Sequence, residues 1–177
     1  MSVQLPQLHM RRALVALPEL TVPEGYAVRT LGPDDAAVWA DLLAENGELG
    51  EWSLDRALPY FAADRRMVLE ASFFVTHDGE PVATAQLHLH LDDAYAPLPE
   101  LGWVAARPGQ QGHGLGYVVC LAVLRAAAAL GHPEFFLRTD DFRLPAIHTY
   151  LKLGLQPWLY DPSAAERWRA IDQKLSR

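Results

Sequence analysis

Short runs of alternating apolar and polar residues are separated by stretches with helical spacing along most of the chain. The runs that predict strands before the last third of the chain lie at residues 26–31, 72–77, 81–91 and 101–106. Asp78-Gly79 between two of these runs is a typical hairpin turn. One predicted helix begins after Gly32-Pro33 and ends near Asn46-Gly47, and a second runs from Ser53 to about Arg66.

The last third of the chain alternates helices with strands. A glycine-rich loop at residues 108–116 leads into an apolar helix at 115–130. The elements predicted after it are a strand at 134–138, a helix at 144–153, a strand at 155–160 and a C-terminal helix that begins with the capping-box pattern of Ser163 and Glu166. This order predicts an α+β fold with a mixed, mostly antiparallel central sheet of about six to seven strands and helices on both faces.

The length of the chain and its apolar content suit one domain. It has 177 residues, of which 50% are hydrophobic. We expect a single domain over residues 1–177, with an N-terminal extension at about residues 1–22 that ends at the candidate linker Pro18–Pro23. No stretch reaches the ~20 apolar residues of a membrane-spanning helix, and the N-terminus lacks the pattern of a secretion signal. These features predict a soluble, cytoplasmic protein.

The charge balance and the cysteine content exclude several classes of function. The chain has 22 acidic and 15 basic residues, which gives a net charge of −7. Nucleic acids and anionic membranes need a cationic face, so we expect neither as a partner, whereas a cationic partner is compatible with this charge. Because Cys120 is the single cysteine, an internal disulfide and a cysteine-based metal site are excluded.

Glycines stand at alternate positions in the loop before the apolar helix, at Gly112, Gly114 and Gly116. Unpaired N–H groups at a helix N-terminus bind anions such as phosphate, and glycine lets a ligand approach the backbone closely. A P-loop is excluded because Tyr117-Val118 stands where lysine and serine or threonine are needed. A dinucleotide-binding turn and a glycine-rich turn without a ligand remain alternatives on this loop alone.

Two patterns in this region resemble those of the GNAT acyltransferase superfamily. The phosphate-loop pattern Gln/Arg-x-x-Gly-x-Gly/Ala matches Gln111–Gly116, and the pattern Ala-Ile-x-x-Tyr-x-Lys-x-Gly-Phe matches Ala146–Leu155. A predicted strand lies between them, as in the family, and the similar region spans residues 101–157. The chain departs from the family at Arg143, where asparagine is usual, and at Leu155, where an aromatic residue is usual.

The resemblance implies acetyl-CoA as the acyl donor and no metal. The pyrophosphate would bind the N–H groups of the glycine loop, and the pantetheine arm would pair like a short strand with the strand before it. The residues that the resemblance assigns to the cofactor are Val104, Ala105, Ala106, Gln111, Gly112, His113, Gly114, Leu115 and Gly116. A backbone N–H of the preceding strand would stabilise the oxyanion that forms on the thioester carbonyl.

Two residues are candidates for proton transfer. Tyr150 is the expected general acid, because a phenol with a pKa near ~10 is protonated at neutral pH and can give its proton to the leaving thiolate. A core tyrosine is the alternative. Glu100, at the start of the strand before the glycine loop, is the candidate general base, and an exposed strand-end glutamate is its alternative.

A polar strand face precedes these residues in the chain. Strict alternation places Thr84, Gln86, His88 and His90 on one face and leucines on the other. This face is a candidate lining of the acceptor site, with a histidine acting through water. A solvated strand face is the plainer interpretation, and a two-histidine metal site lacks a third ligand at a motif spacing.

The sequence therefore predicts an N-acetyltransferase that moves an acetyl group from acetyl-CoA to a primary amine by direct attack in a ternary complex. The acceptor is expected to be a small molecule or a peptide, and the acidic charge favours a cationic one. One alternative is an acyl-CoA-binding sensor of the same fold without catalysis, and another is a nicotinamide-dependent oxidoreductase. The apolar helix at 115–130 is expected to be buried on both sides, either within the domain or against a second subunit of a homodimer.

Overall fold

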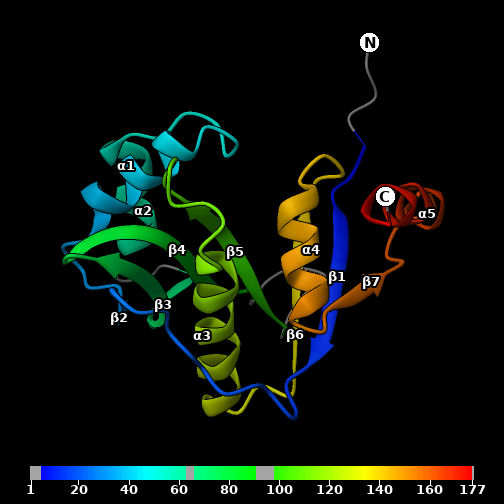
Figure 1. Cartoon of the computed structure of the whole chain (residues 1–177), viewed down its shortest axis with the longest axis horizontal. Coiled ribbons are helices and arrows are strands. Elements are labelled where there is room, and N and C mark those ends of the chain that lie inside the picture. The colour runs from blue at the N-terminus through cyan, green and yellow to red at the C-terminus, as the bar shows by residue number, and fades with distance from the viewer. Residues whose placement is uncertain (1–4, 63–65, 91–97, 177) are drawn as a thin grey trace.

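The structure is a computed structural model that describes residues 5–62, 66–90 and 98–176 (Figure 1). The strands are β1 (Leu8–Ala13), β2 (Tyr26–Thr30), β3 (Met67–His77), β4 (Glu80–Leu89), β5 (Pro99–Ala106), β6 (Glu134–Thr139) and β7 (Gln156–Trp158). The helices are α1 (Ala36–Asn46), α2 (Leu54–Phe61), α3 (Leu115–Ala129), α4 (Leu144–Lys152) and α5 (Ala164–Leu175). Among the described helices, none combines the length and hydrophobicity needed to cross a membrane.

The strands form one seven-stranded sheet in the order β2-β3-β4-β5-β6-β1-β7. All neighbouring strands are antiparallel except β5 and β6, which run parallel. The helix α3 connects these two strands along the chain as a crossover. The predicted mixed, mostly antiparallel sheet is therefore confirmed. In Figure 1, α1 and α2 lie over the β2–β5 half of the molecule, and α4 lies over β6 and β1.

Each face of the sheet has its own core because strand side chains alternate between the faces. Trp39 of α1 and Phe74 of β3 belong to the core under α1 and α2. Leu121 of α3 and Leu87 of β4 belong to the larger core on the opposite face. The apolar helix α3 is buried along most of its circumference, as its sequence predicts, since it packs on β3, β4, β5 and α4.

The strand β1 was not predicted. It lies inside the sheet, between β6 and β7, so residues 8–13 are part of the sheet rather than an N-terminal extension of it. Because β1 has polar residues on both of its faces, its sequence lacks the alternation of apolar and polar residues that predicts a strand. His9 is buried on one face, where it stacks on Tyr160, while the Arg12 guanidinium bonds to the Leu153 carbonyl on the other.

Two helix predictions need correction. The second helix is shorter than predicted and ends at Phe61, within one turn of Pro59. The C-terminal helix begins where expected, but the capping box does not form: Ser163 has helical φ and ψ, and its side chain accepts no capping hydrogen bond.

The interior position of β1 predicts a large stability loss for Met10→Ala. The Met10 side chain is fully buried in the larger core, so its truncation removes apolar contacts and leaves a cavity. We expect the free energy of unfolding to fall by about 2–5 kcal/mol in urea denaturation. Val15→Ala, just beyond the strand at an exposed position, is the control and should change stability by less than ~0.5 kcal/mol. Equal effects of the two substitutions would contradict an interior β1.

Candidate active site

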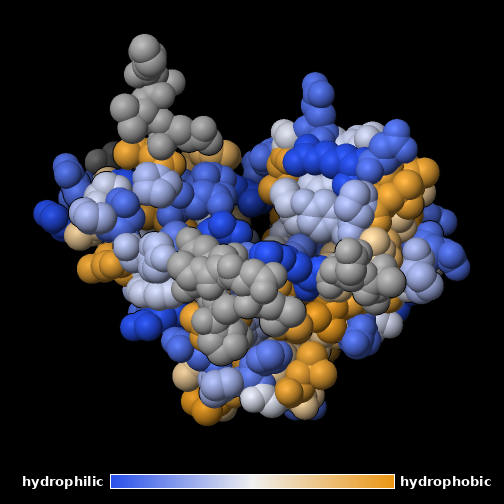
Figure 2. Space-filling model, turned by 180° about the vertical axis from the view of Figure 1, so that it is seen from behind, coloured by the Kyte–Doolittle hydropathy of each residue, from blue (hydrophilic) through white to orange (hydrophobic). Residues whose placement is uncertain are grey.

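The sheet opens between its two parallel strands. Residue pairing between β5 and β6 is limited to Glu100 with Phe136 and Leu101 with Leu137, although β5 continues to Ala106. Beyond this point the backbone edge of β5 faces a gap instead of a neighbouring strand. The space-filling view in Figure 2 shows a hollow between the two halves of the molecule, with hydrophilic residues inside it.

A β-bulge lies in β5 next to this opening. Thr84 of β4 pairs with Ala105, but Gln86 pairs with Gly102, so Trp103 and Val104 together face a single residue of β4. Trp103 has φ 48°, a conformation that non-glycine residues adopt rarely and at a cost. Bulges of this kind bend a strand and re-aim its backbone groups.

The alternation of backbone groups shows which of them face the gap. The Arg107 N–H donates to the Val82 carbonyl of β4 at 2.8 Å, so by regular alternation the Ala106 N–H points away from β4 and toward the gap. The Val104 carbonyl is bonded on the gap side as well, and from it we infer the same side for the Val104 N–H. Their carbonyls point the same way and are already bonded. Arg143 donates to the Val104 carbonyl, and Asn46 donates to the Ala106 carbonyl, both at 3.2 Å.

The first pocket in the opening joins β5, the glycine loop and α4 in a volume of about 480 Å³. Of the residues predicted to bind the cofactor, those that line it are Val104, Ala105, Ala106, Gln111, Gly112, Gly114, Leu115 and Gly116. His113 does not line it, and its ring lies 5.9 Å from the Tyr26 ring on the outside of the loop. The rest of the wall comes mainly from Asn46 and from the α4 side, where Arg143 and Tyr150 take part.

The glycine loop has the conformation that its glycines allow. Gly112 and Gly114 have φ 85° and 73°, and α3 begins directly after them at Leu115. The loop is tied to β2 by the Tyr26 hydroxyl, which donates to the Gln110 side chain at 2.9 Å. A Cβ atom added at Gly116 would meet no protein atom within 4 Å. Packing within the protein therefore does not require glycine there, and this helix N-terminus is open to an anion.

A second pocket, of about 280 Å³, lies against the same stretch of β5. Val104, Arg143 and Tyr150 line both pockets, so the two meet at these residues. The other residues that line the second pocket are Gln7, Leu49, Tyr60, His88, His90, Glu100, Leu101, Gly102, Trp103, Arg138 and Asp140. Two joined pockets allow two ligands to meet at their junction.

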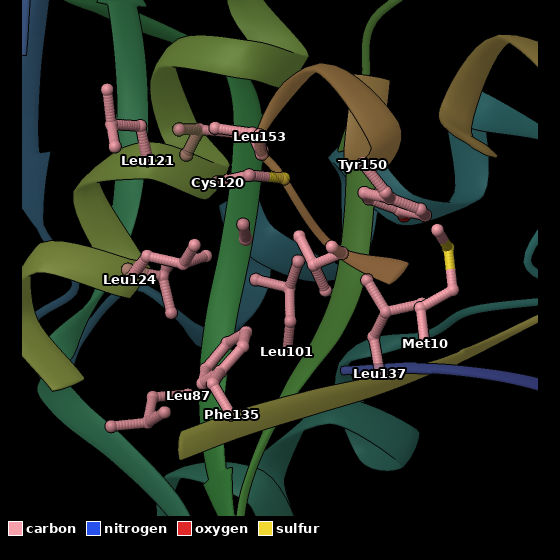
Figure 3. Close-up of a cluster of buried hydrophobic side chains, with 14 of the residues drawn as sticks. Met10, Leu87, Leu101, Cys120, Leu121, Leu124, Phe135, Leu137, Tyr150 and Leu153 are labelled. Carbon is pink, nitrogen blue, oxygen red and sulfur yellow. The ribbon is translucent and has the colours of Figure 1, made fainter. Parts of the chain in front are cut away.

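Tyr150 comes from α4 and lies beside Met10 at the edge of the large core (Figure 3). Only 3% of its surface is exposed. This burial raises the pKa of the Tyr150 phenol well above its usual range; nearby Cys120 adds to the rise, and the Arg143 cation opposes it. The phenol is therefore protonated at neutral pH and can act as a proton donor at the junction of the pockets.

Glu100 is buried, contrary to the alternative of an exposed strand-end glutamate. Its carboxylate accepts from Arg138 Nε at 2.7 Å and from Arg138 Nη2 at 3.0 Å, and it is also hydrogen-bonded to His90. The carboxylate and the two side chains that bind it line the second pocket as one unit. This arrangement connects the predicted base, Glu100, to a histidine of the polar strand face.

The polar face of β4 is not solvated, so the plainer interpretation of it is wrong. Thr84 and Gln86 are fully buried, while His88 and His90 line the second pocket. His88 Nε2 is buried without a hydrogen-bond partner among the described residues, and burial lowers the pKa of His88 to about 4. Within residues 5–62, 66–90 and 98–176, no group of three or more histidine, cysteine, aspartate or glutamate residues is placed to hold a metal ion.

Several residues of the site were not selected from the sequence. Asn46 and Tyr60 come from the two helices before β3, where the sequence has no recognisable motif. No sequence pattern marks Arg138 as a site residue, and only its hydrogen bond to Glu100 in the structure identifies it as one. For Arg143 the sequence did hold a signal, because it stands where the family pattern usually has asparagine. Among the described residues it is the one cation that lines both pockets.

A mixed sheet that opens beside a bulged strand, with a glycine loop at the helix that follows, defines an acyltransferase fold of the acyl-CoA-dependent type. The Acetyltransferase (GNAT) family matches residues 37–155, and the chain belongs to this family. The predicted family is thereby confirmed.

Similar proteins agree with this assignment. The chain is 31% identical over 166 residues to a mycothiol acetyltransferase of Thermomonospora curvata, covering 87% of this chain and 52% of the relative. It is 33% identical over 176 residues to one of Frankia casuarinae, covering 88% of this chain and 49% of the relative. The chain thus spans about half the length of these relatives. A GCN5-related N-acetyltransferase structure from Sphaerobacter thermophilus matches with a TM-score of 0.71 and 20% identity over 86% of this chain and 49% of that one, which shows the shared fold.

The buried Nε2 atom of His88 predicts a loss of stability in acid. Its folded-state pKa of about 4 lies below the unfolded value of ~6.5, so the unfolded state binds the proton more tightly and stability falls as the pH drops through this window. Between pH 7 and pH 5 we expect His88 to contribute about 2 kcal/mol to this fall. Urea denaturation of His88→Gln should show a correspondingly shallower pH dependence, whereas His148→Gln, at an exposed position, should keep the wild-type slope. Equal slopes for all three proteins would contradict a neutral His88.

Proposed function

We propose that the protein transfers an acetyl group from acetyl-CoA to the primary amine of a small molecule by direct attack in a ternary complex. The observation that carries this proposal is the meeting of two pockets at Val104, Arg143 and Tyr150. One pocket has the glycine loop of a pyrophosphate site, and the other has titratable side chains that suit an amine. A thioester and an amine bound in them would bring their reacting atoms together beside a proton donor.

The donor would bind mainly through backbone groups. In this proposal the N–H groups of Gly112–Gly116 bind the pyrophosphate, helped by the positive end of the α3 dipole. The pantetheine arm would lie along Val104–Ala106, where β5 has β4 on one side and no strand on the other. An N–H of this segment polarises the thioester carbonyl and stabilises the oxyanion that forms when the amine attacks.

Proton transfer would use both sides of the junction. An amine with a pKa near ~10 must lose a proton before it attacks, and the Glu100–His90 pair is the nearby group that can accept it. Tyr150 then gives its proton to the leaving thiolate. Burial raises the pKa of Tyr150, but the thiolate forms in the same enclosed place and its proton affinity rises for the same reason. The phenol therefore remains a competent donor to that thiolate.

The pocket favours a small acceptor of balanced charge. Glu100 and Asp140 line it together with Arg138 and Arg143, so the acidic charge of the whole chain does not make this pocket acidic. Two arginines on its wall disfavour an acceptor with several cationic groups. The relatives are named mycothiol acetyltransferases, and we propose a mycothiol-related amine as the first acceptor to test.

Thiol release from acetyl-CoA, measured over a panel of amines, tests the activity. With the amine that the wild type acetylates fastest, we expect Tyr150→Phe to lower kcat by roughly 10²-fold, because the general acid is lost. Tyr160→Phe, a partly exposed tyrosine outside both pockets, should keep the wild-type kcat. Unchanged kcat in Tyr150→Phe would remove this residue from the mechanism. Binding of acetyl-CoA without turnover of any amine would instead favour a non-catalytic acyl-CoA sensor.

Gly116→Ala separates ligand binding from folding. Gly116 lies in the first turn of α3 with open space around it, so alanine should keep or raise the melting temperature through its helix propensity. The added methyl group would occupy the space proposed for the pyrophosphate, and we expect the Kd of CoA in calorimetry to rise at least about tenfold. Gly32→Ala, far from both pockets and without a close contact, is the control. An unchanged Kd in Gly116→Ala would argue against this phosphate site.

A further inference from the structure

The Gln86 side chain on β4 is a fully buried polar group on the face that packs against α1. In the amide orientation that matches donors with acceptors, its oxygen accepts from the Trp39 indole N–H at 2.8 Å and from the Thr84 hydroxyl. Its nitrogen then donates to the carbonyl oxygens of Gly102 and Trp103, each at 3.1 Å. Every hydrogen-bonding group of the amide is thus used, and half of the bonds go to the bulge in β5.

The Trp103 carbonyl needs a partner because Trp103 is one of the two bulge residues without a paired residue in the β4–β5 ladder, and Gly102 is the last paired residue before the bulge. A buried carbonyl without a hydrogen bond is costly, typically ~1–3 kcal/mol. Trp103 adds the cost of its positive φ. The amide of Gln86 satisfies both carbonyls at once, and the Trp39 indole fixes the orientation of the amide from the core under α1.

The bulge determines where the next backbone group points. Val104 follows directly after the two carbonyls that Gln86 binds, and its N–H faces the gap at the junction of the two pockets. A shift of the bulge by one residue would turn this N–H toward β4, because backbone groups alternate along a strand. The direction of the Val104 N–H therefore depends on the position of the bulge.

We propose that Gln86 is a positioning residue for acetyl transfer, which holds the β5 bulge so that the Val104 N–H points at the thioester carbonyl. This inference rests on the proposed function, since it assigns Val104 as the oxyanion donor. In this proposal Gln86 acts through Gly102 and Trp103, and it is not among the residues that line the two pockets. The role explains why a fully buried glutamine stands between the core residue Trp39 and the bulge, where an apolar side chain of similar size would avoid the cost of burying an amide.

Gln86→Met tests the proposal, because methionine keeps the volume of the side chain and removes all its bonds to the bulge. We expect kcat to fall by roughly 10²-fold, the size of effect found when one oxyanion donor is lost. The Kd of CoA in calorimetry should stay within about twofold of the wild type, since the pyrophosphate is bound by the glycine loop. A second variant, Trp39→Phe, removes the N–H that orients the amide together with part of a buried indole ring, leaves both bonds from Gln86 to β5 possible, and should lower kcat by less.

Ser72→Ala is the matched control. The Ser72 hydroxyl is also fully buried and bridges an irregular part of β3 to the backbone of β4, but it has no contact with β5. We expect Ser72→Ala to lower the free energy of unfolding by about as much as Gln86→Met does, while kcat stays at the wild-type value. Folded Gln86→Met protein with wild-type kcat would overturn the proposal, and so would a loss of kcat in Ser72→Ala that matches the loss in Gln86→Met.

Amide hydrogen exchange without any ligand provides a readout that does not need turnover. If Gln86 holds the bulge, exchange at residues 102–106 should be faster in Gln86→Met than in the wild type, whereas exchange in β3 should not change. Unchanged exchange at residues 102–106 would overturn the role of Gln86. An absence of turnover in the wild type with every amine would overturn the proposed function, and the exchange result would still decide whether Gln86 holds the bulge.

Discussion

Beyond Leu101 the backbone of β5 loses its parallel neighbour, and the site follows from how that exposed edge is used. A strand edge inside a protein must have its N–H and C=O groups satisfied. Here the carbonyls of Val104 and Ala106 are bonded by side chains from α1 and from the start of α4, while their N–H groups face the gap. An edge prepared in this way can accept an extended ligand much as it would accept another strand.

The charged groups around the opening are paired with one another. Glu100 is bound by Arg138 and His90, and the Arg143 guanidinium donates to Glu48 as well as to the Val104 carbonyl. Removing one partner of such a pair would leave the other charge buried and uncompensated, which is strongly destabilising. The arrangement gives a second pocket that is polar but nearly neutral in a chain with a net charge of −7, so the overall charge of the protein says little about the charge of this pocket.

The candidate site lies within a chain that is shorter than the relatives it matches. The glycine loop, both pockets and Tyr150 all lie within a chain that spans about half of each mycothiol acetyltransferase it matches. The opening is formed between β5 and α4 of the same chain, and both pockets are lined by its own residues. The glycine loop, the two pockets and Tyr150, to which the proposed reaction assigns its roles, are therefore all present in this chain.

Local patterns in the sequence determined most of the elements, the glycine loop before α3 and the place of Tyr150, because hydrophobic period, turn residues and helix N-termini depend on neighbouring residues. The position of β1 inside the sheet, the bulge at Trp103 and the partners of Glu100 were decided only by the tertiary structure. These features depend on residues far apart in the chain: Gln86 meets Trp39 and Trp103, and Glu100 meets Arg138. A strand with polar residues on both faces, or a carboxylate beside a distant arginine, has no local pattern, since its stability comes from contacts that exist only after the sheet has formed.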